Sequence, residues 1–153
     1  MRGRSVVLIG FLSCVSLIPA SGSLPVGNSD AAVQVGREVK IRTFAFGGIG
    51  IAGVISEGEK YFFKVLFSSG ARGFRELFER GDAQSKAYAL VGLRWFSDPR
   101  YNRLRDAFVA QGSKVVTMDG CIMHEDDAEA LVSRIDARTW DDYITAVVRR
   151  KKV

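Results

Sequence analysis

Cys121 and His124 are the residues whose chemistry could support catalysis in this sequence of 153 residues, which contains one histidine and two cysteines. A thiolate becomes an effective nucleophile when an imidazole lies within hydrogen-bond reach and a third group orients it. The two residues are three positions apart, and this spacing alone sets no such geometry. We therefore assign no catalytic residue in the main interpretation. Cys121 and His124 remain the candidates of an alternative one, a thiol-dependent enzyme or redox-responsive protein.

The same segment could bind a metal, because Glu125, Asp126 and Asp127 follow His124 directly. A structural zinc site takes four ligands, and a catalytic site usually takes three from the protein. Apart from Cys14, the chain has no further cysteine or histidine to complete such a set. We therefore expect no metal site. We attribute the acidic run to the amino end of a helix, where negative charge is favourable.

A glycine run, GIGIAG at residues 48–53, matches the G-x-G-x-x-G spacing of dinucleotide-binding loops. In such a loop the third glycine lies inside a helix that starts at once, and an acidic residue follows about 20 positions later. Here the next helix signal is at Ser56, and position 73 is Gly73. We expect no nucleotide or other cofactor. The run is interpreted as a structural turn that brings an extended segment close to the helices.

Six predicted helices account for most of the sequence, and in each of them apolar residues recur three or four positions apart. The third helix is the most apolar, because Ala87, Leu90 and Val91 belong to one broad face, and we expect it at the centre of the fold. The predicted ranges are about 56–68, 72–80, 82–95, 98–112, 125–135 and 139 onward.

Capping residues indicate where these helices begin. Ser56 and Glu59 have the capping-box spacing, in which the Ser hydroxyl accepts from a free helix amide and the Glu side chain returns to the Ser amide. Asp82 and Asp98 precede the third and fourth helices as N-caps. Thr139 repeats the capping-box type of start before the last helix.

Two segments favour an extended conformation. Residues 38–46 alternate, with Ile41 and Ala45 on one side and Phe44 on the other, and residues 114–118 form a short β-branched run. Together with the helices, these segments predict a mainly α fold. We expect a compact helical bundle of αα-hairpins with a short extended N-terminal segment.

The domain organisation follows from composition. Residues 38–153 are predicted to form a single helical domain, and residues 23–37, which are small and polar, a flexible lead-in. Residues 1–22 have the order of a secretory signal peptide.

In that signal peptide, two arginines form the positive start, residues 5–18 the apolar stretch, and small residues around Ala20 the cleavage region. The apolar stretch is shorter than the run of about 20 residues that a spanning helix needs. We expect cleavage before Ser23, or alternatively after Ala20, and a periplasmic or secreted location without a membrane span. Cys14 raises the alternative of a lipoprotein.

Removal of these 22 residues from the 153 leaves 131 and reduces the net charge from +5 to +3, because two arginines are lost. Such a charge without a basic stripe does not indicate a nucleic-acid binder. Cys121 then has no partner for an internal disulfide, and it is buried, reactive or paired with another molecule. Of these possibilities we favour burial beside Ile122 and Met123.

Two resemblances extend this interpretation. Residues 81–108 resemble one hairpin of HEAT-like or armadillo-like repeats. The segments FGGIGIAGVISEGE (46–59), AYALVGLRWF (87–96) and TMDGCIM (117–123) resemble a group of small secreted bacterial proteins with no assigned activity, which implies an exported helical domain. We therefore expect a non-enzymatic extracytoplasmic protein that binds a protein or an envelope component. The four cations at residues 149–152 suit weak contact with an anionic envelope surface.

Overall fold

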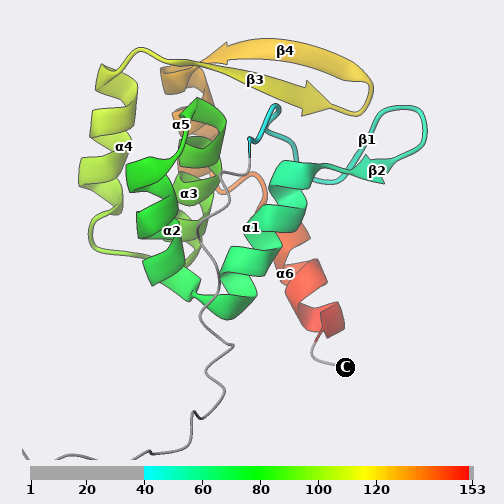
Figure 1. Ribbon diagram of the computed structural model, residues 1–153, viewed down its shortest axis with the longest axis horizontal. Coiled ribbons are helices and arrows are strands. Elements are labelled where there is room, and N and C mark those ends of the chain that lie inside the picture. The colour runs from blue at the N-terminus through cyan, green and yellow to red at the C-terminus, as the bar shows by residue number, and fades with distance from the viewer. Residues whose placement is uncertain (1–39, 152–153) are drawn as a thin grey trace, which may run out of the picture. The chain divides into compact units, whose positions relative to one another are not determined.

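The computed structural model describes residues 40–151, which form a mainly helical, compact domain with six helices and two small β-hairpins (Figure 1). The predicted signal peptide, lead-in and Cys14 lie outside the described residues. The helices are α1 (Glu57–Ser68), α2 (Gly70–Arg80), α3 (Ala83–Trp95), α4 (Tyr101–Ala110), α5 (Ala128–Asp136) and α6 (Asp141–Lys151). The strands are β1 (Gly48–Ile49), β2 (Val54–Ile55), β3 (Lys114–Asp119) and β4 (Ile122–Asp127).

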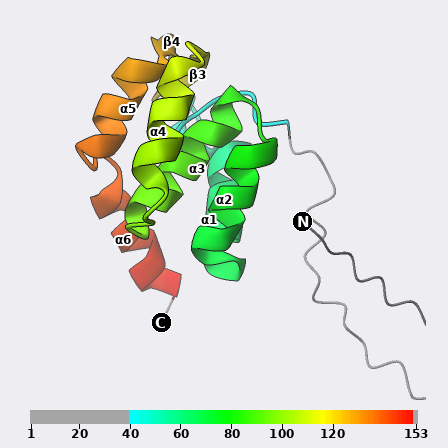
Figure 2. The ribbon, with the colours of Figure 1, turned by 90° about the vertical axis from the view of Figure 1, so that its left-hand side faces the viewer.

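Helix α3 is the centre of the domain, as the sequence predicts. It contacts α1, α2, α4, α5 and β3, and it lies among the other helices (Figure 2). Tyr88, Leu90 and Leu93 of this helix are completely buried. Gly92 lets α2 approach closely, because a Cβ atom at this position would lie 2.4 Å from the Phe74 ring. The mainly α fold is therefore confirmed, and its core is one continuous cluster of buried apolar side chains.

Helices α1, α2 and α3 begin and end within two residues of the predicted ranges. Asp82 is the N-cap of α3 and accepts a hydrogen bond from the N–H of Ser85. Asp98 differs from the prediction, because its buried carboxylate accepts from the N–H of Arg100 and pairs with Arg75. It therefore closes the turn before α4, which begins at Tyr101.

The largest error of the sequence prediction concerns residues 122–127. We expected a helix to begin at Glu125, inside this range. These residues form β4, which pairs antiparallel with β3 over six residues, and α5 begins only at Ala128. The acidic residues therefore lie in a strand. Asp126 shows why this is stable, because its carboxylate accepts hydrogen bonds from the Thr117 hydroxyl and from Arg134.

The extended segment before α1 also differs from its predicted alternation. Phe44, expected on the polar side, is buried together with Ile41 and Ala45. Its ring lies between those of Tyr88 and Trp140, with centroid distances of 4.7 and 5.1 Å. Aromatic packing of this kind outweighs a simple two-residue period.

The start of the last helix was predicted two residues too early. The Thr139 hydroxyl donates to the carbonyl oxygen of Arg134 in α5, so it closes the preceding helix and caps no amide of α6. Helix α6 begins at Asp141 and is fixed to the bundle by Ile144, which is completely buried. Among residues 40–151, no helix is both long and apolar enough to span a bilayer.

Candidate functional site

The turn of the β3–β4 hairpin carries Cys121, and the following strand carries His124. Cys121 lies in the two-residue turn with Gly120, and His124 lies in β4 opposite Thr117. A strand advances about 3.3 Å per residue, so three positions separate two backbones by up to about 10 Å. No hydrogen bond between the thiol and the imidazole occurs within residues 40–151. The structure therefore does not pair the two candidates as nucleophile and base.

The expected burial of Cys121 is wrong, because the side chain is exposed. The reason is its place at the tip of a hairpin, where Gly120 adopts a left-handed conformation with φ of +56°. Ile122 and Met123, which we expected to cover the thiol, are themselves exposed.

The glycine run forms the other hairpin. Gly50 and Gly53 adopt left-handed conformations, and the N–H of Gly53 donates to the carbonyl oxygen of Gly50 at 3.1 Å. The N–H of Gly50 donates to the carbonyl oxygen of Gly120 at 2.8 Å, so the two hairpin turns are joined. These N–H groups are used within the protein, and α1 starts only at Glu57. The run therefore lacks the loop-to-helix geometry of a phosphate-binding site.

A buried carboxylate, Glu59, links three parts of the chain. Its side chain is 1% exposed. One carboxylate oxygen accepts from the N–H of Gly47 at 2.7 Å, and the other accepts from the Tyr143 hydroxyl of α6 at 2.6 Å. Ser56 accepts from the N–H of Glu59 as the capping box predicts, but the expected return of Glu59 to the Ser56 amide is wrong. The carboxylate is turned to Gly47 and Tyr143 instead.

Tyr88 extends this buried polar cluster. Its hydroxyl donates to the carbonyl oxygen of Ala45 at 2.6 Å, accepts from the N–H of Ala45 at 2.8 Å, and lies 3.2 Å from the Ser56 hydroxyl. Burial raises the pKa of Tyr88 to about 12, and burial with the Glu59 hydrogen bond raises the pKa of Tyr143 to about 12. Tyr88 and Tyr143 are therefore neutral donors that hold the extended segment and α6 in place.

The pKa of Glu59 is raised by burial, although the hydrogen bonds from Tyr143 and Gly47 partly oppose the increase. Within the described residues no cation pairs with this carboxylate. Raised carboxyl pKa values often mark catalytic acids. Here the oxygens are already bonded and enclosed by protein, so a substrate has no access to them. The arrangement indicates a structural role.

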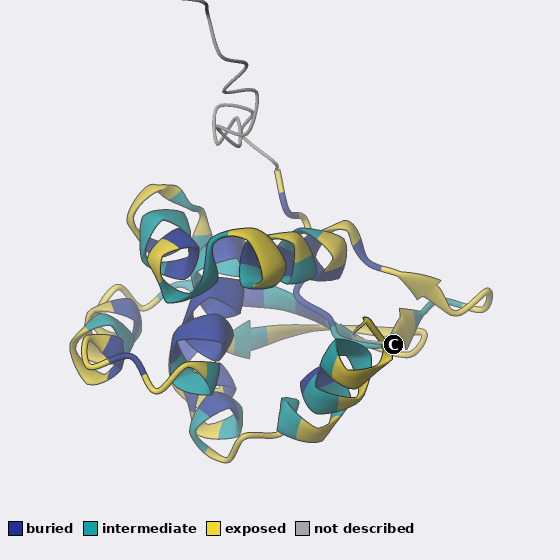
Figure 3. Ribbon diagram, turned by 90° about the horizontal axis from the view of Figure 1, so that it is seen from below, coloured by how far each residue is buried: buried dark blue, intermediate teal, exposed yellow. Residues whose placement is uncertain are grey.

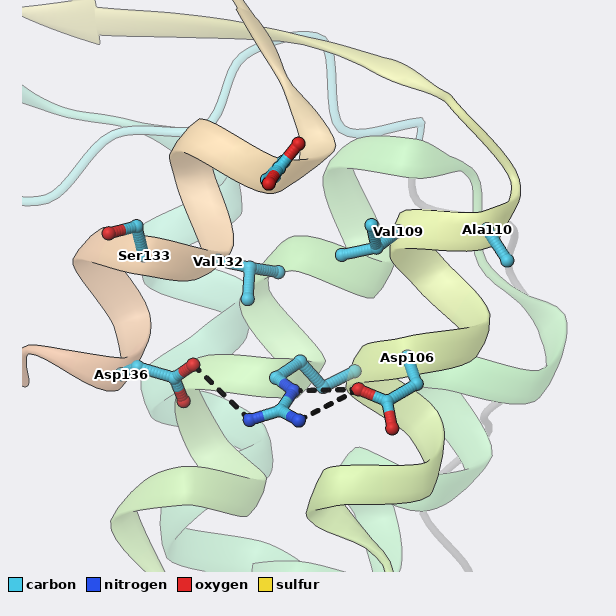
Figure 4. Close-up of a pocket in the computed structure, with 8 residues that line it drawn as sticks. Asp106, Val109, Ala110, Val132, Ser133 and Asp136 are labelled. Carbon is cyan, nitrogen blue, oxygen red and sulfur yellow. Dashed lines mark hydrogen bonds and ion pairs between the residues drawn. The ribbon is translucent and has the colours of Figure 1, made fainter.

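A shallow groove of about 510 Å³ lies between α4 and α5 (Figure 4). Val109 and Val132 contribute apolar side chains. Its cation, Arg105, already pairs with Asp106 at 2.8 Å and with Asp136 at 3.4 Å. The charge that could attract an anionic ligand is therefore neutralised within the groove. Residues 40–151 also contain no group of three or more metal-binding side chains.

Much of the two hairpins is exposed (Figure 3), and most of the exposed large apolar residues belong to them. Five of the seven large hydrophobic residues that are exposed within residues 40–151 lie there, and Ile51 is fully exposed. The bond between Gly50 and Gly120 holds the two turns together. We call this set the hairpin platform: Ile51, Val54, Ile55, Ile122 and Met123.

The position of this platform was not predicted, because the sequence interpretation placed no strand at β1, β2 or β4. The signal that could have revealed it is Asp119-Gly120, a turn sequence between two stretches that can each be extended.

Comparison of the chain with protein-family models, curated proteins and solved structures gave no match. The resemblance to small secreted bacterial proteins and to HEAT-like hairpins therefore stays a prediction. The hairpin platform is the candidate functional site on the geometry of the chain alone.

We predict that ionisation of Glu59 makes the protein less stable as the pH rises. Because the folded pKa lies above the ordinary value of 4.5, the folded state keeps this proton to higher pH than the unfolded chain. The stabilising contribution is complete below 4.5 and is lost as the pH rises through the folded pKa. In denaturant titrations, the free energy of unfolding of the wild type minus that of Glu59→Gln should fall with rising pH.

Glu57→Gln is the matched control, because Glu57 is exposed in the same helical turn, where its side chain pairs with Lys60. The free energy of unfolding of the wild type minus that of Glu57→Gln should not fall with rising pH in the same range. A difference for Glu59→Gln that stays flat or grows with pH would contradict the assignment.

We predict that Cys121 reacts as a simple exposed thiol, because no imidazole reaches it. The alkylation rate of the folded protein should match that of the denatured protein within about threefold, and His124→Ala should leave it unchanged. Cys14→Ser removes the other thiol where the full chain is used. A strong decrease in rate on His124→Ala would instead favour the thiol-dependent function.

Proposed function

We propose that this chain is an exported, non-enzymatic helical domain that binds another protein through the hairpin platform. The observation that carries the proposal is the exposure of Ile51, Ile122 and Met123 on two joined hairpins of a domain whose helices bury their apolar faces. Ile122 and Met123 point to opposite faces of β4, so apolar surface is available on both faces of this hairpin. Exposed apolar surface of this kind is typical of protein interaction sites.

The charge around the platform supports a protein partner over an anionic surface. Asp119 and Glu125 border it, with side chains 69% and 59% exposed. They pair with Arg134 and Lys114, so the positive charge beside the platform is balanced within the protein and offers little attraction to phosphate groups of lipids or nucleic acids. The cations Arg149, Arg150 and Lys151 belong to the far end of α6, away from the hairpins (Figure 1). The apolar surface of the hairpins and the cations of α6 that could attract an anionic surface therefore lie on different parts of the domain.

Export is the second part of the proposal, and it rests on the sequence of residues 1–22. A positive start, a short apolar stretch and small residues occur in the order of a cleaved signal.

We predict that a photo-crosslinking amino acid at Ile51 or Met123 captures the same protein in cells. Arg72 is the matched control, because its side chain is 82% exposed and belongs to α2. The captured protein, once purified, should bind the wild-type chain. Binding should weaken by about 30-fold or more when Ile51→Asp and Ile122→Asp are combined, since central apolar contacts dominate interface energies.

Arg72→Asp should bind that protein as tightly as the wild type. The proposal is contradicted if the double variant keeps full affinity, if position 72 captures the same protein equally well, or if the crosslinked product is lipid.

We predict that the protein recovered outside the cytoplasm begins at Ser23, or at Ser21 if cleavage follows Ala20. Amino-terminal sequencing or intact mass measures this directly. Replacing Ala20 and Gly22 by bulky residues should cause the uncleaved chain to accumulate. An exported protein that keeps Met1, or one that stays in the cytoplasm, would be incompatible with the signal.

A further inference from the structure

Strand β4 is an open edge of the β3–β4 hairpin. Strand β3 pairs with β4 on one side, and on the other side it is bridged to Phe44. Within residues 40–151 no strand pairs with the outer side of β4. All of its residues except Asp126 are exposed. An edge of this length can accept an additional strand from another molecule.

The backbone groups available at this edge follow from the hydrogen bonds of its neighbour. The N–H of Met118 donates to the carbonyl oxygen of Phe44, and the N–H of Phe44 donates to that of Val116, so residues 116 and 118 point away from β4. In an antiparallel pair, the backbone N–H and carbonyl groups of two opposite residues either point toward each other or both point away from each other. Their partners Glu125 and Met123 therefore direct their N–H and carbonyl groups outward.

The side chains of the edge change from apolar to acidic along the strand. Met123, Glu125 and Asp127 share one face, because they are alternate residues. Met123 is 63% exposed. Glu125 lies 3.8 Å from Lys114, but both side chains are more than half exposed, and such a pair is weak. An incoming cation could therefore replace Lys114 at little cost.

The same pattern disfavours the pairing with a second copy of the chain that is centred on His124. If two β4 strands paired antiparallel about His124, Met123 of each would lie opposite Glu125, and Ile122 opposite Asp126. Apolar side chains would then face carboxylates, and Glu125 and Asp126 would have only the cations of their own chain, Lys114 and Arg134. Charges on an edge strand commonly prevent self-association in this way.

We propose that β4 binds an extended segment of the partner protein as an additional antiparallel strand, and that this segment carries a cationic side chain two residues before a large apolar one. In this register the residue opposite Glu125 precedes the residue opposite Met123 by two positions. The cation then meets the carboxylate and the apolar side chain meets Met123. This inference rests on the proposed function, because it names the chemistry that the hairpin platform recognises.

The probe is a synthetic peptide with lysine at its first and third positions, isoleucine at its fifth and seventh, and threonine elsewhere. Added to the full chain, it should bind saturably, and the amides of Met123 and Glu125 should gain protection from hydrogen exchange. A second peptide with glutamate in place of lysine should bind about tenfold or more weakly, since like charges face each other across the strands.

Comparing Met123→Pro with Met123→Ala distinguishes the contribution of the backbone N–H to peptide binding from that of the side chain. Both remove the thioether, but only proline removes the outward N–H, which β3 does not use, so the hairpin is retained. We expect the proline variant to bind the lysine peptide about tenfold more weakly than the alanine variant. Glu125→Lys provides a second test that keeps every backbone group, because it should reverse the preference between the two peptides.

The proposal is overturned if neither peptide binds, if binding leaves the Met123 and Glu125 amides unprotected, or if Glu125→Lys keeps the preference for lysine. These outcomes do not depend on the cellular crosslinks at Ile51. If the crosslinked partner binds the platform while the peptides fail, the proposed function stands and strand addition is wrong.

Discussion

The hydrogen bonds that join the backbone of Ala45 and Gly47 to side chains of α1 and α3 determine how the segment before α1 is placed in this domain. The N–H of Ala45 donates to the Tyr88 hydroxyl of α3, and the carbonyl oxygen of Ala45 accepts from that hydroxyl and from Ser56. The N–H of Gly47 donates to the Glu59 carboxylate of α1. Unpaired, these groups would each cost roughly 1–3 kcal/mol. A segment without regular secondary structure is thereby fixed on the helices at one defined register.

That register places the rest of the hairpin region. With Ala45 held, Phe44 reaches both the aromatic cluster and the edge of β3, where it exchanges two backbone hydrogen bonds. The chain then continues to Gly50, which binds the β3–β4 turn at Gly120. Glu59 also binds Tyr143, so α6 depends on the same carboxylate. The cluster therefore positions both hairpins and the last helix, although it lies away from the surface.

The sequence predicts the helical part well because its signals are local. The apolar spacing within each helix and the cap at Asp82 act within one or two turns, and α1 to α3 follow them. The strands depend on distant partners. The acidic residues from Glu125 to Asp127 have the local pattern of a helix start, but the pairing with β3 makes them part of a strand. The two ends of the Glu59–Tyr143 bond lie 84 residues apart, so no local pattern indicates it.

The same distinction explains why the sequence offers Cys121 and His124 as the candidates of an alternative interpretation, whereas the exposed hairpin platform becomes visible only in the structure. A reactive residue type is visible in a sequence, but exposure is a property of the assembled fold. Ile122 and Met123 would be ordinary core residues if they belonged to a helix, and their exposure follows from the strand conformation of β4. Their burial on another protein would recover part of the roughly 1.5–3 kcal/mol that each side chain contributes when removed from water. In the proposed strand addition, the acidic half of the strand limits which molecules can provide that burial, because Glu125 favours a cationic segment opposite it.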